Sequence, residues 1–162
     1  MLDLTWAKRC DELTRATERL ASIGAQDALI LLRDSFSSPK VLHLLRCSPS
    51  ADNPALQTFD RHLRSAFSKI TNSALSDIQW LQASMPIAHG GLGVRRVSSL
   101  AIPAFLASAA STLPLQDDIL SLCPCATDTF LDQYLSIWSS SPGLPLDPLP
   151  GKVILGQTWS SY

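Results

Sequence analysis

The chain has 162 residues, of which 46% are hydrophobic, and carries a formal net charge of −1. This length and composition predict a single folded domain with a core and exclude a chain that is disordered over most of its length. No apolar run approaches the roughly 20 residues of a membrane span. The first residues do not resemble a signal peptide, because Asp3 stands where basic residues are usual. We therefore expect an intracellular protein, in the cytoplasm or the nucleus, with no membrane partner.

The first half of the chain predicts helices, because apolar residues recur at helical spacing with polar residues between them. Gly24 is placed to end the first helix, and Pro39 suits the first turn of the third. The fourth helix is the clearest, with Asp52 or Asn53 as its N-cap, and Ser76 is a suitable N-cap for the fifth. The expected helices of this half are 4–23, 26–37, 40–47, 54–72 and 76–84.

A turn with three glycines follows, at Gly90, Gly91 and Gly93. Glycine permits positive φ and close approach of the backbone, so this stretch predicts a tight turn that packs Leu92 and Val94 inward. The stretch has no Gly-Lys-Ser/Thr ending and no preceding strand, which argues against a nucleotide-binding loop. The less favoured interpretation is that Arg95 and Arg96, just behind the turn, contact a phosphate backbone.

Beyond the turn, an alanine-rich stretch predicts a thin helix that is capped by Ser98 or Ser99. Pro103 fits this helix only near its first turn, and Pro114 is expected to end it. Residues 139–162 are rich in proline and serine and predict a loop or an extended tail. The remaining expected helices are 99–112, 116–122 and 127–138.

These elements together predict an all-α fold. We expect an irregular bundle of about six to eight helices in one domain over residues 1–138, followed by a proline-rich C-terminal tail over residues 139–162. Trp6, Trp80 and Trp138 are expected to anchor the core rather than to stack on nucleic-acid bases.

The sequence shows no pattern that is typical of a metal or cofactor site. Cys123 and Cys125 are separated by one residue, which is not the two-residue spacing of a zinc site. His43, His62 and His89 are dispersed, and the nucleophile turn of a serine hydrolase is absent from the sequence. We therefore expect ordinary reduced thiols, no metal and no cofactor.

Charge is distributed unevenly along the chain. Residues 33–96 hold eight Lys or Arg and four Asp, whereas residues 97–162 hold one Lys and five Asp. A basic middle fits an anionic partner, and it fits equally well a contact between the basic and the acidic parts of the chain. The candidate phosphate-binding residues are Arg33, Lys40, Arg46, Arg61, Arg64, Lys69, Arg95 and Arg96.

Five short blocks also carry a family resemblance, through their order along the chain. They are Ala28–Phe36, Pro39–Pro49, Phe59–Arg64, Gly90–Arg95 and Ala104–Ser108. This order resembles the segment that follows the catalytic palm in reverse transcriptases of non-LTR (LINE-like) retrotransposons. That segment includes the thumb and the helical connection beyond it, and the resemblance covers some two thirds of the chain.

The resemblance implies a thumb that follows the template–primer backbone, with cations contacting the phosphates of RNA or an RNA/DNA hybrid regardless of sequence. It also implies that the remainder of a reverse transcriptase polyprotein is a partner. Polymerases of this family need metal-binding aspartates in the palm, including a Tyr-x-Asp-Asp hairpin, which this sequence lacks. Asp117-Asp118 has neither the tyrosine nor a strand pattern around it, so we expect no catalytic residue in the chain.

The sequence thus favours a non-catalytic fragment of a reverse transcriptase that binds nucleic acid through a basic helical face. The alternative is a helical protein-interaction module, or a degenerate retroelement product with no retained activity. The two hypotheses differ in whether a coherent basic strip is present on the folded surface.

Overall fold

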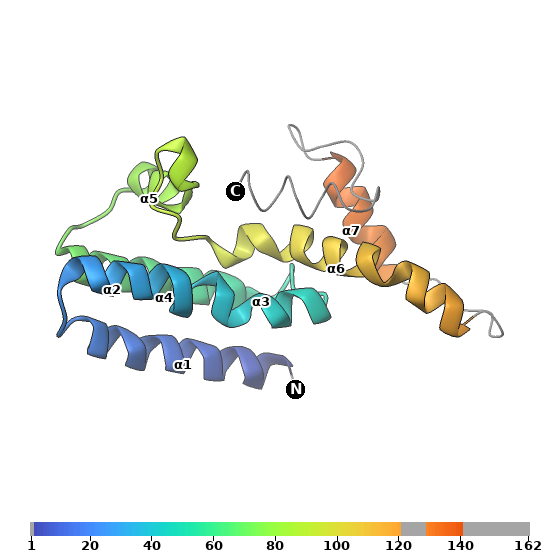
Figure 1. The fold of residues 1–162 in the computed structure, drawn as a ribbon, viewed down its shortest axis with the longest axis horizontal. Helices are drawn as coiled ribbons and strands as arrows, with labels where there is room; N and C mark the ends of the chain where they lie inside the picture. Colours follow the sequence, from blue (N-terminus) through green and yellow to red (C-terminus); the bar gives the residue numbers. More distant parts are fainter. Residues whose placement is uncertain (1, 121–128, 141–162) are drawn as a thin grey trace.

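The computed structural model describes residues 2–120 and 129–140 (Figure 1). The regular structure of these residues is helical and includes no β-strand, so the all-α prediction is confirmed. None of the described helices is both long enough and apolar enough to cross a bilayer. The elements in chain order are α1 Leu2–Leu20, α2 Ala25–Leu31, the π-helix η1 Leu32–Phe36, α3 Ser38–Cys47, α4 Pro54–Thr71, α5 Asp77–Ser84, the 3₁₀-helix η2 Ile87–His89, α6 Val97–Leu120 and α7 Thr129–Ser140.

Helices α1 and α4 pack against each other and run in the same direction (Figure 1). Near the start of both, Asn53 Nδ2 donates a hydrogen bond to Asp3 Oδ1 at 3.0 Å, and farther along Thr14 Oγ1 lies 3.3 Å from His62 Nδ1. Helices α2, η1 and α3 follow one another end to end and run back beside this pair, and α6 packs along α3. The bundle of α1 to α4 thereby supports α6.

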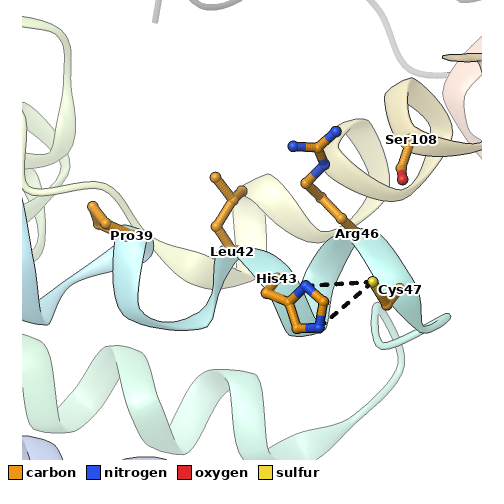
Figure 2. A pocket seen from close by; sticks show the side chains of 6 residues that line it. All are labelled: Pro39, Leu42, His43, Arg46, Cys47 and Ser108. Carbon is orange, nitrogen blue, oxygen red and sulfur yellow. Dashed lines mark hydrogen bonds between the residues drawn. The ribbon is translucent and has the colours of Figure 1, made fainter.

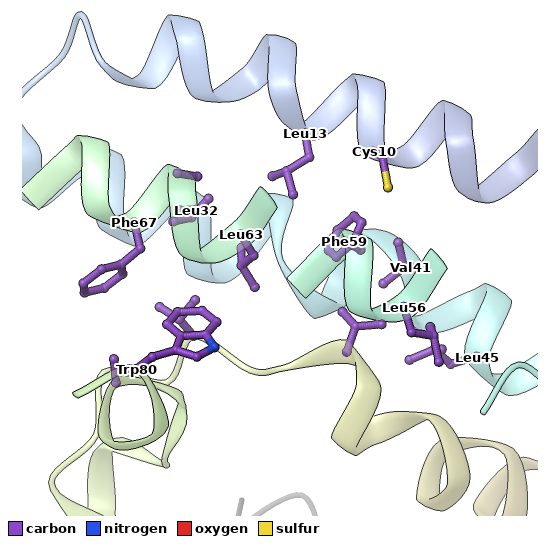
Figure 3. Packing of buried hydrophobic residues seen from close by; sticks show 14 of the residues in the cluster. Cys10, Leu13, Leu32, Val41, Leu45, Leu56, Phe59, Leu63, Phe67 and Trp80 are labelled. Carbon is purple, nitrogen blue, oxygen red and sulfur yellow. The ribbon is translucent and has the colours of Figure 1, made fainter. Parts of the chain in front are cut away.

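The main core lies between these helices, each of which buries one apolar face (Figure 3). On α4 the buried residues recur every three or four positions, as the sequence predicts. Trp6 meets Phe59 edge to face with ring centroids 6.3 Å apart, and Phe67 meets Trp80 in the same way at 6.3 Å. Trp6 and Trp80 therefore anchor the core, as predicted.

A second, smaller cluster joins α7 to α6. Leu106, Tyr134 and Trp138 are buried in it, and the rings of Phe105 and Tyr134 lie 5.4 Å apart. Tyr134 Oη also accepts a hydrogen bond from the backbone N–H of Ala51, at 3.0 Å. This bond fixes α7 to the loop between α3 and α4, and the burial of Trp138 confirms its predicted role as a core residue.

The connection between α2 and α3 is a π-helical turn. The backbone N–H of Ser37 donates to Leu32 O at 2.8 Å, five residues earlier, and Ser37 Oγ donates to Arg33 O at 2.6 Å. Ser37 is buried, so these bonds satisfy polar groups that water does not reach. The wider turn lets α3 begin almost at once, with Pro39 in its first turn as predicted.

Helix α1 is shorter than predicted and ends at Leu20 instead of Ile23. The backbone N–H and the Oγ of Ser22 both donate to Arg19 O, at 3.1 and 2.7 Å, which closes the last turn. Ile23 is exposed and does not belong to the core, so extending the helix to this residue would bury no further apolar surface. Gly24 is the N-cap of α2 rather than the C-cap of α1.

Helix α6 is continuous from Val97 to Leu120, whereas the sequence predicted two helices, 99–112 and 116–122. A proline inside a helix removes one backbone donor and crowds the preceding turn, at a cost of about 3 kcal/mol. Pro103 and Pro114 both lie within α6 all the same, so the predicted break at Pro114 is wrong. The first half of α6 packs against the rest of the fold through Ala101, Ala104 and Leu106, which favours a helix through Pro103.

The predicted boundary between domain and tail falls inside α7. This helix continues to Ser140, past the predicted end at Trp138, and its packing on α6 makes it part of the described helical body. The remainder of the predicted tail, residues 141–162, and the predicted helix start at residues 127–128 lie outside the described residues.

Candidate nucleic-acid interface

The cations that the sequence predicts to bind phosphates lie on several elements of the fold. Some come from the side of the bundle formed by η1 and α3, and others from α4 or from the segment before α6. Arg33 lies on η1, Lys40 and Arg46 on α3, Arg61, Arg64 and Lys69 on α4, and Arg95 and Arg96 just before α6.

Ion pairs within the protein engage the cations of η1 and of the start of α3. Arg33 Nε donates to Asp34 Oδ1 at 2.6 Å, and this hydrogen bond holds the pKa of Asp34 below its ordinary value. Lys40 Nζ lies 3.6 Å from Glu12 Oε2 on α1, to which Arg9 also donates at 2.7 Å. The hydrogen bond from Arg9 is the main reason why the pKa of Glu12 is lowered. Each of these cations therefore has a carboxylate beside it, which lowers the positive potential that a phosphate would meet there.

Arg64 connects α4 to the start of α5. Its Nη1 donates to Asp77 Oδ1 at 2.6 Å, and its Nη2 donates to the backbone oxygen of Leu75. A guanidinium that is held by a carboxylate and a carbonyl positions the loop before α5. Arg64 therefore has a structural role in this fold, and part of its hydrogen-bonding capacity is already used within the protein.

The remaining polar side of α4 carries cations and hydroxyl groups. We call it the outer face of α4; it is turned away from the core, and Arg61 and Lys69 lie on it. Arg61 Nη2 donates to Thr58 Oγ1 at 3.0 Å, which holds the guanidinium along the helix. In the described part of the chain, Arg61 and Lys69 form no ion pair. The outer face of α4 comprises Gln57, Thr58, Arg61, Ser65, Ser68 and Lys69.

The outer face contains no carboxylate because the single acidic residue of α4, Asp60, points inward. Asp60 Oδ1 accepts a hydrogen bond from the backbone N–H of Val97 at 2.7 Å, and its Oδ2 accepts one from that of Ser98 at 3.1 Å. Ser98 Oγ also donates to Asp60 Oδ2. Asp60 thus caps the N-terminus of α6 from another helix, where a negative charge is favoured by the helix dipole.

The adjacent side of α1 is less favourable to an anion. Thr14 contacts His62 of α4, and Asp11 and Glu18 lie on the same side of α1 as Thr14, three positions before it and four after it. Both carboxylates are exposed. A polynucleotide that follows the outer face of α4 would therefore pass near two negative charges, which reduces its affinity.

The glycine turn has a structural role. It folds back on the end of α5 through backbone hydrogen bonds: Gly91 N donates to Pro86 O at 2.9 Å and Gly93 N to Met85 O at 2.9 Å. Gly90 adopts φ +78, and a Cβ on Gly91 would lie 2.0 Å from Met85 O. The geometry fits the predicted tight turn. The two side chains that the turn carries behave differently: Val94 is buried as predicted, but the inward packing of Leu92 is wrong, because that residue is half exposed.

The other predicted cations occupy separate positions. Arg95 and Arg96 are half-buried at the start of α6, and Arg46 is exposed on α3. Asp117 and Asp118 lie in the last turn of α6, within a helix and not in a hairpin. The described residues include no group of three or more potential metal ligands.

Two residues that join distant parts of the fold could not be identified from the sequence. Asp60 looks like one more charge on an amphipathic helix, and Tyr134 looks like an ordinary apolar position of the last helix. Their roles depend on partners that are 37 and 83 positions away in the sequence. Helical periodicity indicates which side of α4 carries Asp60, but it does not indicate which helix end meets it.

Comparison with known proteins identifies no relative of the chain. No protein-family model matches the chain, and neither the curated proteins nor the solved structures include a match.

Proposed function

We propose that the chain is a thumb-and-connection-like part of a non-LTR reverse transcriptase polyprotein, and that it binds the phosphate backbone of RNA or an RNA/DNA hybrid. The family assignment is supported by the order of the five sequence blocks and is compatible with the all-α fold. In this proposal the chain binds a polynucleotide and performs no catalysis by itself.

The observation that supports binding most strongly is the absence of carboxylates from the outer face of α4. Arg61 and Lys69 are eight positions apart on one helix, which separates them by about 12 Å along its axis. That distance corresponds to about three to four nucleotide rises along one strand. Hydroxyl groups of Thr58, Ser65 and Ser68 lie on the same face and are common partners of phosphate oxygens.

The experiment is fluorescence anisotropy with a labelled RNA/DNA hybrid at low salt. We expect weak binding by the unaltered chain and an affinity about tenfold lower for the double variant Arg61→Ala/Lys69→Ala, which loses two phosphate contacts. The matched control is Lys8→Ala/Arg19→Ala, which removes the same charge from a side of α1 that does not face α4. The affinity of this control variant for the hybrid should be less than about threefold below that of the unaltered chain.

A second arm tests the influence of the α1 carboxylates. Asp11→Asn/Glu18→Gln removes the two negative charges beside the outer face and should raise the affinity about threefold. Equal affinities for Arg61→Ala/Lys69→Ala and for the Lys8→Ala/Arg19→Ala control would reject the outer face of α4 as the binding surface.

The alternative, a protein-interaction module, is favoured by a group of exposed apolar residues on α5 and the turn after it. Ile78 is 79% exposed and Ile87 62%, and Leu81 and Leu92 are about half exposed. Large apolar side chains that remain exposed are candidate contacts for a protein partner. This alternative predicts no polynucleotide binding, so the same anisotropy titration separates the two functions.

A further inference from the structure

Cys47, at the end of α3, carries an exposed thiol that lies beside an imidazole. His43 and Cys47 are four positions apart and therefore share one side of the helix. Cys47 Sγ lies within hydrogen-bonding distance of the imidazole, 3.6 Å from His43 Nδ1 (Figure 2). Both side chains are exposed, so a small molecule in solution can reach the sulfur atom.

The imidazole is placed to take the thiol proton. A thiol becomes a strong nucleophile only when it loses its proton, and a neutral imidazole within hydrogen-bonding distance accepts that proton. Cys47 is the last residue of α3, where the free carbonyl groups of the helix end disfavour an anionic sulfur. The reactivity of Cys47 therefore depends on His43.

The surface hollow beside the thiol, between α3 and α6, gives a reagent a place to bind. It has a volume of about 480 Å³, within the range of about 300–1,000 Å³ that small-molecule sites occupy. Pro39 and Leu42 form the apolar part of its lining, and the guanidinium of Arg46 extends away from the sulfur atom (Figure 2). None of the described residues that line the hollow is acidic. The hollow therefore favours an anionic reagent whose charge lies several bonds away from the atom that reacts.

The other described thiol, that of Cys10, has a different environment. Cys10 is buried in the core, and burial raises the pKa of its thiol, which keeps it protonated and unreactive. Of the two described cysteines, only Cys47 combines exposure with a neighbouring base and a neighbouring cation.

We propose that Cys47 is a site of S-thiolation by an anionic small-molecule disulfide of the glutathione class. His43 takes the proton of the Cys47 thiol, and the sulfur attacks one sulfur atom of the disulfide. A new S–S bond to Cys47 forms as the old one breaks, and the released glutathione leaves as a thiolate that takes the proton from His43. Cys47 is oxidised, the released glutathione is reduced, and Arg46 attracts a carboxylate of the incoming disulfide. The proposal is independent of polynucleotide binding, since it involves no residue of the outer face of α4.

The test follows the reaction of the reduced chain with oxidised glutathione at pH 7, by mass spectrometry of the peptides that contain each cysteine. We expect glutathione on Cys47 and none on Cys10 while the chain is folded. His43→Gln should slow the reaction of Cys47 at least about fivefold at pH 7, because the thiol loses its base. At about pH 10, where thiols ionise without a base, the rates of this variant and of the unaltered chain should converge. A loss of rate that persisted at that pH would contradict the role of His43 as the base.

A second comparison isolates the role of Arg46. Arg46→Gln should slow the reaction of Cys47 with oxidised glutathione about threefold and leave its reaction with the neutral hydroxyethyl disulfide unchanged, because the guanidinium attracts only the anionic reagent. The matched control is Arg19→Gln, which removes the same charge from the last turn of α1 and should change neither rate.

The three substitutions are at exposed positions, and unchanged helical circular dichroism would show that the variants fold. Equal rates for His43→Gln and the unaltered chain at pH 7 would overturn the proposal. It would also be overturned if Arg46→Gln reacted with oxidised glutathione as fast as Arg19→Gln does, or if Cys47 of the unaltered chain took up no glutathione.

Discussion

Asp60 shows how one side chain connects two helices and also shapes a surface. Its carboxylate satisfies the first two backbone N–H groups of α6, and its inward position leaves the outer face of α4 without a negative charge. A Ser or Thr cap from the same helix would satisfy these donors too, but it would not fix α6 to α4.

The first prediction at the residue scale concerns this cap. Asp60→Asn retains the shape of the side chain but removes its charge and one acceptor, so we expect the free energy of unfolding to fall by about 1–3 kcal/mol. Urea denaturation followed by circular dichroism measures the change. Asp27→Asn, at an exposed position of α2, is the control and should change stability by less than about 0.5 kcal/mol. Similar values for the two variants would contradict the role of Asp60.

The second residue-scale prediction concerns Tyr134 and pH. Burial raises the pKa of Tyr134 above 10.0, its ordinary value, because the ionised phenol is disfavoured inside the protein. The unfolded chain therefore loses this proton at lower pH than the folded chain, so the stability that Tyr134 contributes below about pH 10 is lost as the pH rises through its folded pKa.

The measurement is the difference in unfolding free energy between the unaltered chain and Tyr134→Phe as a function of pH. At pH 7 the variant should be about 1 kcal/mol less stable, because the N–H of Ala51 loses its acceptor. The difference should shrink above about pH 10. A difference that is constant with pH would refute this account.

At the element scale, the glycine turn offers a graded series. A Cβ on Gly91 would collide with Met85 O at 2.0 Å, so Gly91→Ala should destabilise the protein by about 3 kcal/mol or more. Gly90 has no atom within 4 Å of its Cβ position, but its φ of +78 should make Gly90→Ala cost about 1–2 kcal/mol. Gly24→Ala, where φ is −55 and a Cβ would lie 3.8 Å from Asp27 Oδ2 in ordinary contact, should change stability by less than about 1 kcal/mol.

Thermal unfolding of these three variants tests the close approach in the turn. The order of destabilisation should be Gly91→Ala, then Gly90→Ala, then Gly24→Ala. If Gly91→Ala were as stable as Gly24→Ala, the backbone of the turn could not lie against the end of α5 as described.

Local signals in the sequence predict much of each element. Asn53 caps α4 through Ala55 N at 2.8 Å, and Ser76 forms a capping box with Gln79 at the start of α5, both at predicted positions. These signals work because the interacting groups are two or three residues apart. The continuous α6 was not predictable in this way, because the local signal of Pro114 predicts a break that the structure does not have.

At the scale of the whole molecule, the sequence predicts the cations of the candidate interface but not their availability. Arg64 and Lys40 appear equivalent to Arg61 in the sequence, yet the fold places Asp77 and Glu12 beside them. Such ion pairs join residues from different helices and depend on packing, which single-chain periodicity does not specify. Among the three predicted cations of α4, Arg61 and Lys69 form no ion pair in the part of the chain that the structure describes, whereas Arg64 pairs with Asp77.

The most direct test of the proposed function is the salt dependence of binding to an RNA/DNA hybrid. If Arg61 and Lys69 contact phosphates, the plot of log affinity against log salt concentration should be shallower for Arg61→Ala/Lys69→Ala, by about 1.4–1.8 in slope. The Lys8→Ala/Arg19→Ala control should retain the slope of the unaltered chain. Identical slopes for the unaltered chain and Arg61→Ala/Lys69→Ala, or no binding by the unaltered chain at low salt, would contradict the proposal that α4 grips a polynucleotide.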